Sequence, residues 1–140
     1  MSDKYFLDTN IFVYAFDSTD SKKQDKANNL IKFALANHMG CISYQVIQEF
    51  LNVATRKFVV PLSIPDCEKY LNSVLSPLCE IYSNIDLYLR SLDILERWQF
   101  SFYDSLIISA ALQSKCKILY TEDLQHQEKI QDLTICNPFI

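Results

Sequence analysis

The chain has 140 residues, of which 49% are hydrophobic and 21% are charged, and its formal net charge at pH 7 is -4. This length suits one domain around a single core, and the composition is that of a globular chain rather than a disordered or membrane-spanning one. We therefore expect one domain over residues 1–140, with no membrane contact. The first ten residues lack the features of a signal peptide, which predicts a cytoplasmic protein.

Glycine, cysteine and histidine counts exclude several kinds of site. The single glycine, Gly40, rules out the glycine-rich loops that bind nucleotide phosphates. The five cysteines contain no C-x-x-C pair, so we expect core thiols rather than disulfides or a zinc site. Two histidines are too few for a zinc centre or a Ser–His hydrolase. Oxygen ligands remain, although the negative net charge gives no support for a broad nucleic-acid-binding surface.

Apolar runs and helical spacing predict strands that alternate with helices. We expect strands at residues 5–10, 41–42, 79–82, 117–121 and 133–136. We expect helices at about 27–35 (ended by Gly40), 44–57 (capped by Ser43), 63–75, 86–98 and 102–112, and a helical turn at 126–130. This order predicts an α/β fold, a three-layer α/β/α sandwich with a central, mostly parallel sheet.

Four acidic residues stand where predicted strands end or predicted helices begin. Asp8 ends the first strand, and Glu49 lies in the helix after the second strand. Asp104 lies at the start of the helix at 102–112, and Asp123 follows the fourth strand. Because the carboxyl ends of parallel strands share one edge of the sheet, we expect these acids to converge there. Converging carboxylates repel one another, so their pattern indicates a bound cation.

Each acid also has a purely structural interpretation. Asp8 can bond the turn that follows it, with Asn10 either orienting Asp8 or capping the next element. Glu49 can be a solvated residue at the margin of its helix's apolar stripe. Asp104 fits a capping box that begins at Ser101.

Asp123 has a rival in its neighbour Glu122. Alternation along a strand points Thr121 and Asp123 to one side and Glu122 to the other. We therefore prefer Asp123 as the site residue, with Thr121 assisting it.

Together, the segments LDTN, VIQEF, FYDSL and TEDL and the ending NPF resemble the PIN domain, especially VapC-type toxin ribonucleases. The resemblance spans the whole chain and implies a PIN-like fold. It also implies that Asp8, Glu49, Asp104 and Asp123 form a metal-binding quartet for magnesium-dependent RNA hydrolysis, with Mn²⁺ able to substitute for Mg²⁺. One departure follows Asp123, where many relatives have a glycine and this chain reads LQHQE.

The chemistry that this resemblance implies assigns a role to each acid. Asp8, Asp104 and Asp123 hold one or two ions, because Mg²⁺ prefers carboxylates, water and substrate phosphate. Glu49 orients or deprotonates the attacking water, or serves as a further ligand. The resemblance also implies an RNA substrate, a cognate antitoxin that binds near the acids, and a homodimer.

Two other functions are compatible with the residues. One is a catalytically silent PIN-like module that binds RNA or protein. The other is an unrelated metal-dependent phosphatase or a phosphorylated receiver, since both also use acids at strand ends. The Asp8-Thr9-Asn10 sequence fits a receiver poorly, because a receiver has an acidic pair near its start.

Overall fold

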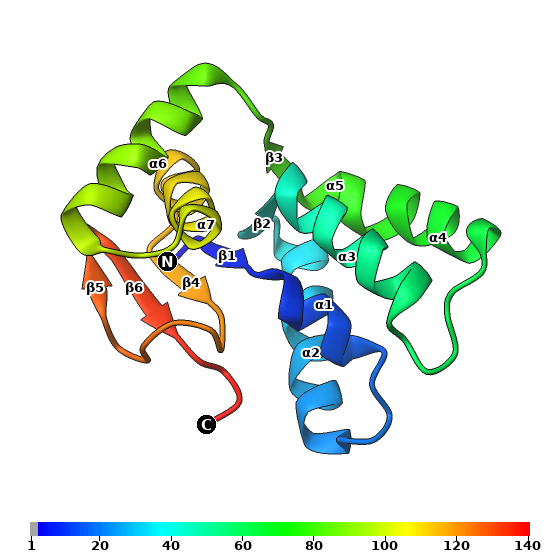
Figure 1. Cartoon of the computed structure of the whole chain (residues 1–140). Coiled ribbons are helices and arrows are strands. Elements are labelled where there is room, and N and C mark those ends of the chain that lie inside the picture. The colour runs from blue at the N-terminus through cyan, green and yellow to red at the C-terminus, as the bar shows by residue number, and fades with distance from the viewer. Residues whose placement is uncertain (1–2) are drawn as a thin grey trace.

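A six-stranded sheet in the order β3-β2-β1-β4-β6-β5 forms the centre of the protein, in a computed structural model that describes residues 3–140 (Figure 1). The strands are β1 (Tyr5–Leu7), β2 (Gly40–Ser43), β3 (Cys79–Ile81), β4 (Ile118–Tyr120), β5 (Lys129–Ile130) and β6 (Leu133–Cys136). All neighbouring pairs are parallel except β5 with β6. The predicted mostly parallel sheet is confirmed.

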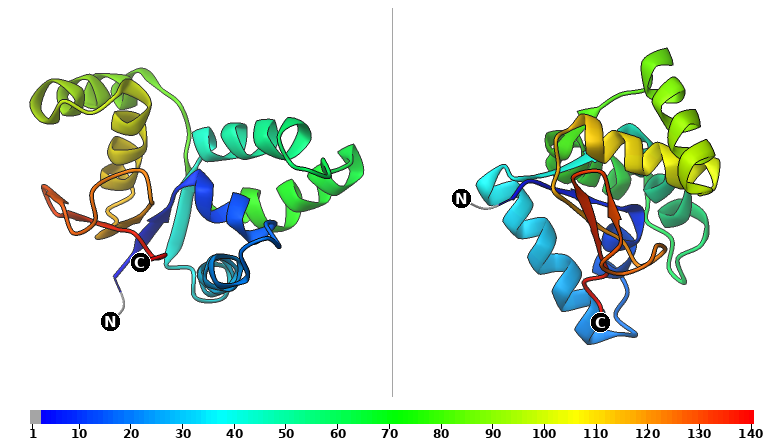
Figure 2. Two further views of the ribbon diagram at one scale, coloured as in Figure 1. Left: turned by 60° about the horizontal axis from the view of Figure 1, so that its bottom comes forward. Right: turned by 90° about the vertical axis from the view of Figure 1, so that its left-hand side faces the viewer.

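Helices cover both faces of this sheet. They are α1 (Thr9–Ala15), α2 (Ser21–Asn37), α3 (Tyr44–Arg56), α4 (Ile64–Tyr70), the π-helical turn η1 (Leu71–Leu75), α5 (Ser76–Leu78), α6 (Ile85–Trp98) and α7 (Phe102–Gln113). Figures 1 and 2 show α6 and α7 on one side of the sheet and α1 to α5 on the other. The predicted three-layer α/β/α arrangement is therefore confirmed.

Strand β1 lies at the middle of the sheet and sets where a ligand site can form. Tyr5 pairs with Gly40 of β2 on one side and with Ile118 of β4 on the other. The chain adds β2 and β3 outward on one side of β1 and then continues with β4 on the opposite side. Open α/β sheets bind their ligands at such a switch point, outside the carboxyl ends of the strands.

Helix α7 is the most enclosed helix of the fold. Seven consecutive residues, Ser105 to Ala111, are buried, as the apolar run in the sequence predicted. Its first turn is capped by Ser101, whose Oγ accepts a hydrogen bond of 3.1 Å from the Asp104 amide. The helix therefore presents its N-terminal end at the edge of the core.

The first strand is shorter than predicted, because α1 begins at Thr9 inside the expected strand. Asp8 stands between the two elements as the N-cap of α1, and Ile11 and Phe12 carry the helix into the core. Sequence analysis missed α1 because its seven residues are too few to show a clear helical period. Asp8 consequently lies at a strand–helix junction.

The prediction that Gly40 ends the preceding helix is wrong. Helix α2 ends at Asn37, and His38 takes the left-handed conformation with φ 58°. Gly40 belongs to β2, where a Cβ would lie 2.3 Å from Ala34 Cβ and 2.8 Å from Tyr5 Cε2. The glycine is needed because α2 packs against β2 at this point.

The helical turn expected at residues 126–130 is absent: residues 126–127 form a turn, and residues 129–130 are strand β5 of a β-hairpin. Strand β5 pairs antiparallel with β6, and Gln127 turns the chain with φ 72°. The Gln127 amide donates to the Ile135 carbonyl, and the Ile135 amide donates to the Glu128 carbonyl, both at 2.8 Å. Pairing with β6, a contact that local spacing does not reveal, decides this conformation.

The five cysteines are all free thiols, as predicted. Cys41, Cys67 and Cys116 are buried, and Cys79 and Cys136 are half-buried. Among residues 3–140, none of the helices is both long and apolar enough to cross a lipid bilayer.

Candidate active site

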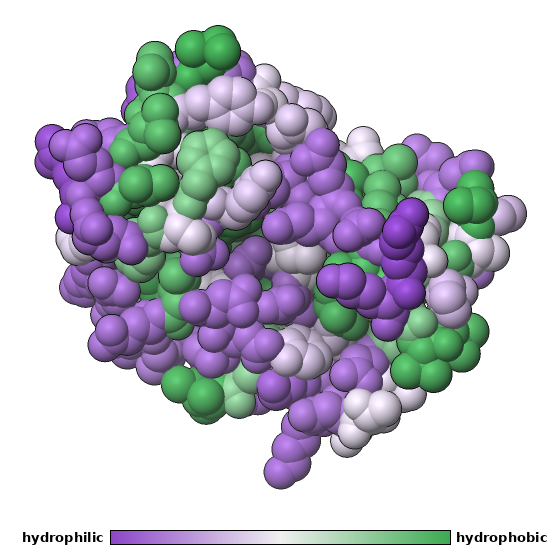
Figure 3. Space-filling view, in the orientation of Figure 1, coloured by the Kyte–Doolittle hydropathy of each residue, from purple (hydrophilic) through white to green (hydrophobic). Residues whose placement is uncertain are grey.

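A cavity of about 200 Å³ opens at the carboxyl edge of the sheet. All four predicted acids line it: Asp8, Glu49, Asp104 and Asp123. Thr9, Asn10, Gln45 and Tyr103 line it as well. In Figure 3 this side of the molecule is hollowed near its centre, between the part formed by α6 and α7 and the part formed by α1 to α5, with hydrophilic residues around the hollow.

Asp8 is the buried member of the four, with 7% of its surface exposed. Its Oδ1 accepts a hydrogen bond of 2.7 Å from the Thr9 amide, and its Oδ2 accepts one of 2.8 Å from Thr121 Oγ1. Burial raises the pKa of Asp8 to about 6, the charges of Asp123 and Glu49 add to the increase, and the two hydrogen bonds oppose it. The site thus holds a carboxylate whose ionised form is costly without a nearby positive charge.

Glu49 reaches the cavity from α3, where it lies next to the buried Phe50. Thr9 Oγ1 donates a hydrogen bond of 2.7 Å to Glu49 Oε1. Thr9 is buried, and sequence analysis did not single it out as a site residue. Its position directly after Asp8 was the available signal, because the first residue of a helix at the sheet edge faces the same region as its cap.

Asp123 lies in the loop after β4 and is the most exposed part of this group. Asn10 Nδ2 lies 3.1 Å from each of its carboxylate oxygens, and its own amide donates to Thr121 Oγ1 at 3.1 Å. Partial burial raises the pKa of Asp123, and the neighbouring charges of Glu122 and Asp104 raise it further. Asn10 therefore orients Asp123, whereas the sequence suggested that it would orient Asp8 or cap the next element.

Asp104 contributes from the first turn of α7. Its backbone amide makes the capping bond to Ser101, so the cap does not occupy its carboxylate, and the residue lines the cavity. The structural and the functional interpretations of Asp104 are therefore compatible.

Glu122 lies outside this cavity, in agreement with the alternation predicted along the strand. Tyr14 OH donates to Glu122 Oε1 at 2.5 Å, and Lys23 Nζ lies 3.3 Å from Oε2. These contacts hold the loop after β4 against α1 and α2, and they leave Asp123 on the cavity side.

The donor set suits a hard divalent cation, because every candidate ligand is a carboxylate oxygen. Within residues 3–140, no three His, Cys, Asp or Glu side chains are grouped closely enough to hold one ion. Mg²⁺ usually binds proteins through one or two carboxylates and completes its shell with water and substrate phosphate, so this geometry fits such an ion. The described lining residues include no lysine or arginine to neutralise a phosphate.

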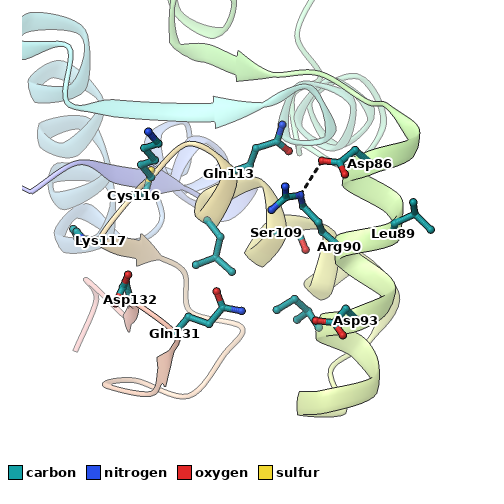
Figure 4. A pocket seen from close by; sticks show the side chains of 13 residues that line it. Asp86, Leu89, Arg90, Asp93, Ser109, Gln113, Cys116, Lys117, Gln131 and Asp132 are labelled. Carbon is teal, nitrogen blue, oxygen red and sulfur yellow. Dashed lines mark hydrogen bonds and ion pairs between the residues drawn. The ribbon is translucent and has the colours of Figure 1, made fainter.

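A larger cavity, of about 840 Å³, lies between α6, α7 and the turn at Gln131 and Asp132 (Figure 4). It contains none of the four acids. Its charged residues are of both signs, and Arg90 Nε bonds Asp86 Oδ2 at 2.8 Å, as the dashed line in Figure 4 marks. Chemistry, rather than size, therefore selects the acidic cavity as the candidate active site.

Comparison with known families agrees with this fold. The model of the PIN domain family matches residues 5–132, so the chain belongs to the PIN domain family. No curated protein matches the chain significantly.

Among solved structures, the chain is similar to a toxin–antitoxin complex from Klebsiella pneumoniae, with 18% identity, a TM-score of 0.66 and coverage of 97% of this chain and 98% of the other. It is also similar to VapC20 of Mycobacterium tuberculosis, a toxin that cleaves the sarcin–ricin loop (18% identity, TM-score 0.64, coverage 86% and 90%). A third structure is VapBC2 from Rickettsia felis bound to a promoter DNA fragment (24% identity, TM-score 0.64, coverage 94% and 96%). These similarities show a shared fold.

Proposed function

We propose that this PIN domain is a magnesium-dependent endoribonuclease that hydrolyses RNA phosphodiester bonds, and that it is the toxin of a toxin–antitoxin pair. The observation that carries the proposal is the convergence of Asp8, Glu49, Asp104 and Asp123 on one cavity. These are the four positions that the PIN resemblance assigned to the metal site.

The energetic cost of Asp8 supports a functional role over a structural one. A buried carboxylate with two other acids nearby lowers the stability of the metal-free fold, and an asparagine would keep much of the local hydrogen bonding without the charge. Such a cost is typical of active sites, where stability is exchanged for function. A catalytically silent module has no need of this arrangement.

The residues have distinct roles in the proposed reaction. Asp8, Asp104 and Asp123 would together hold one or two Mg²⁺ ions, or Mn²⁺ in their place, directly or through water. When bound, the cation would supply positive charge to the scissile phosphate and lower the pKa of the attacking water. Glu49, which accepts a hydrogen bond from Thr9, would orient the attacking water or accept its proton. Asn10 and Thr121 support the site by fixing Asp123 and Asp8.

The partners in the proposal come from the similar structures. Two of them are toxin–antitoxin complexes, and VapC20 is a toxin that cleaves the sarcin–ricin loop. We extend this to the present chain as a cognate antitoxin that covers the acidic cavity, together with a homodimeric state. Co-expression with the neighbouring reading frame, followed by size-exclusion chromatography with light scattering, tests both.

Cleavage of total cellular RNA by the purified chain tests the activity directly. Wild type, Asp8→Asn and Asp104→Asn are compared with Mg²⁺, with Mn²⁺ and with EDTA. Asp132→Asn is the matched control, because Asp132 is exposed and lies at the other cavity. We expect discrete EDTA-sensitive fragments from wild type and from Asp132→Asn, and intact RNA from the two cavity variants.

Other outcomes would contradict the ribonuclease. Equal cleavage by wild type and Asp8→Asn would mean that a contaminating nuclease acts on the RNA. Intact RNA with all proteins, together with hydrolysis of a small phosphate ester, would indicate a phosphatase. Intact RNA and no hydrolysis would favour the silent binding module.

A further inference from the structure

A second cavity, of about 220 Å³, adjoins the acidic cavity. Residues of α7, the first turns of α3 and α6, the end of β2 and Ser83 line it. Gln45 and Tyr103 line both cavities, and Gln45 Nε2 lies 3.4 Å from the Tyr103 carbonyl oxygen. A molecule bound at the acids therefore has its next segment beside this second cavity.

Ser43, which lines the second cavity, has a buried hydroxyl without a hydrogen-bond partner in the described part of the chain. Ser43 is 2% exposed, and its Oγ has no hydrogen-bond partner among residues 3–140. Although Ser43 is the N-cap of α3, its side chain makes no capping bond. A buried polar group without a partner is costly, so a ligand that bonds this hydroxyl would relieve that cost.

Six of the remaining lining residues carry aromatic rings or amide groups. Tyr44, Phe102, Tyr103 and Tyr88 provide the rings, and Gln45 and Gln48 provide the amides. The Tyr103 ring lies edge-to-face with Phe102, with centroids 5.6 Å apart, and 65% of Tyr103 is exposed. The Tyr88 hydroxyl is hydrogen-bonded to Ser83 Oγ, which holds that ring in place.

This combination matches the chemistry of an unstacked nucleobase. Proteins bind single-stranded RNA by stacking bases on aromatic rings and by hydrogen-bonding base edges with polar side chains. At about 220 Å³ the cavity is smaller than the roughly 300 Å³ of the smallest drug-sized sites, which suits one base rather than two. None of the described lining residues carries a charge, so the cavity offers no site for a phosphate.

We propose that this cavity, bounded by Ser43, Gln48 and Tyr88, is a nucleobase subsite for single-stranded RNA. It receives the base next to the scissile phosphate and gives the enzyme its preference among bases. The inference deepens the ribonuclease proposal and rests on it for the identity of the ligand.

Equilibrium binding tests the subsite without relying on catalysis. The full chain carrying Asp8→Asn is titrated with fluorescent oligo(U), oligo(A) and oligo(C) ribonucleotides at one fixed salt concentration, because salt alone changes such affinities. Ser43→Ala, Gln48→Ala and Tyr88→Ala are added singly to this parent. The matched control is Phe33→Ala, which removes an exposed aromatic ring from α2, away from this cavity.

We expect the parent to prefer one oligomer. Tyr88→Ala should weaken binding of that oligomer about tenfold through lost stacking. Ser43→Ala and Gln48→Ala should reduce the difference between the oligomers, and Phe33→Ala should change nothing. Ser43→Ala is informative because the Ser43 hydroxyl bonds no described residue, so its removal should keep or raise the melting temperature rather than lower it. Equal affinities and equal preferences for all variants would overturn the subsite.

Cleavage assays separate failure of the subsite from failure of the ribonuclease. If wild type leaves total RNA intact while the parent binds oligomers in a Tyr88-dependent way, the subsite stands and the nuclease does not. If the three variants, with Asp8 intact, cut at the same bases as wild type, the nuclease stands and the subsite is wrong. Loss of antitoxin binding with unchanged RNA binding would assign the cavity to a protein contact and overturn the proposal.

Discussion

Thr121 Oγ1 donates a hydrogen bond of 2.8 Å to Asp8 Oδ2, across a separation of 113 residues in the chain. The same hydroxyl accepts a bond from the Asp123 amide, so Thr121 connects the residues that follow β1 and β4. Its side chain is completely buried. One hydroxyl group thus links two acids of the candidate site directly.

Replacing this hydroxyl should impair activity more than folding. We expect Thr121→Val to lower RNA cleavage about 10- to 100-fold, the range found when a residue that orients metal ligands is removed. The activity should fall because Asp8 loses the hydrogen bond that holds Oδ2 and favours its ionised form. Single-turnover rates at saturating Mn²⁺ measure this. Thr134→Val on β6 is the control, and equal losses in both variants would contradict a specific role for Thr121.

Metal-free stability should decrease with rising pH because of Asp8. Its pKa is about 6 in the folded chain and 3.8 as the reference value, so the native state binds more protons than the unfolded state between those values. Stability is therefore lost as pH rises from about 4 to 6, and the full cost remains above pH 6. Urea denaturation in EDTA across this range measures the slope.

Asp8→Asn should remove that cost. We expect the variant to be more stable than wild type at pH 7 in EDTA, by on the order of 3 kcal/mol, because each unit of pKa difference corresponds to about 1.4 kcal/mol. The advantage should shrink toward pH 4. A variant less stable than wild type at pH 7 would show that the Asp8 carboxylate contributes to the fold and would remove our main argument for a functional charge.

Divalent cations should stabilise the wild-type fold. At a hundredfold excess over the dissociation constant, Mg²⁺ or Mn²⁺ binding is worth about 2.7 kcal/mol, which raises the melting temperature. Asp123→Asn should reduce this increase in melting temperature, because Asp123 lines the acidic cavity. Asp132→Asn should keep the increase, because Asp132 does not line that cavity. Calorimetry over a manganese titration measures the effect, and a constant wild-type melting temperature would contradict the metal site itself.

Gly40→Ala should destabilise the fold by about 2 kcal/mol, within the usual range for overpacking a core. The new methyl group would lie 2.3 Å from Ala34 Cβ, which forces α2 away from β2. Ala34→Gly in the same chain should recover part of the loss by making room. Denaturant titration of the single and double variants measures both changes, and an additive double variant would mean that the two positions do not interact.

Much of the fold and the four acids could be predicted from local sequence. Apolar runs typical of strands alternated with apolar residues at helical spacing, and this pattern indicated the α/β sandwich. Acids at the ends of strands indicated where the carboxyl edge of a parallel sheet would carry charge. The Ser101 cap and the enclosed α7 were also local signals. These features are readable because each depends on residues within one or two turns of one another.

Other features required the tertiary structure, since they depend on contacts between distant segments. Residues 129–130 form strand β5 because β6 lies beside them, and Gly40 is needed because Ala34 and Tyr5 pack closely there. Thr9 meets Glu49, and Asn10 meets Asp123, across 40 and 113 positions of the chain. The sequence by itself determined which acids reach the sheet edge, because strand ends place them there. Only packing decided which neighbours orient them and that Asp8 alone of the four is buried.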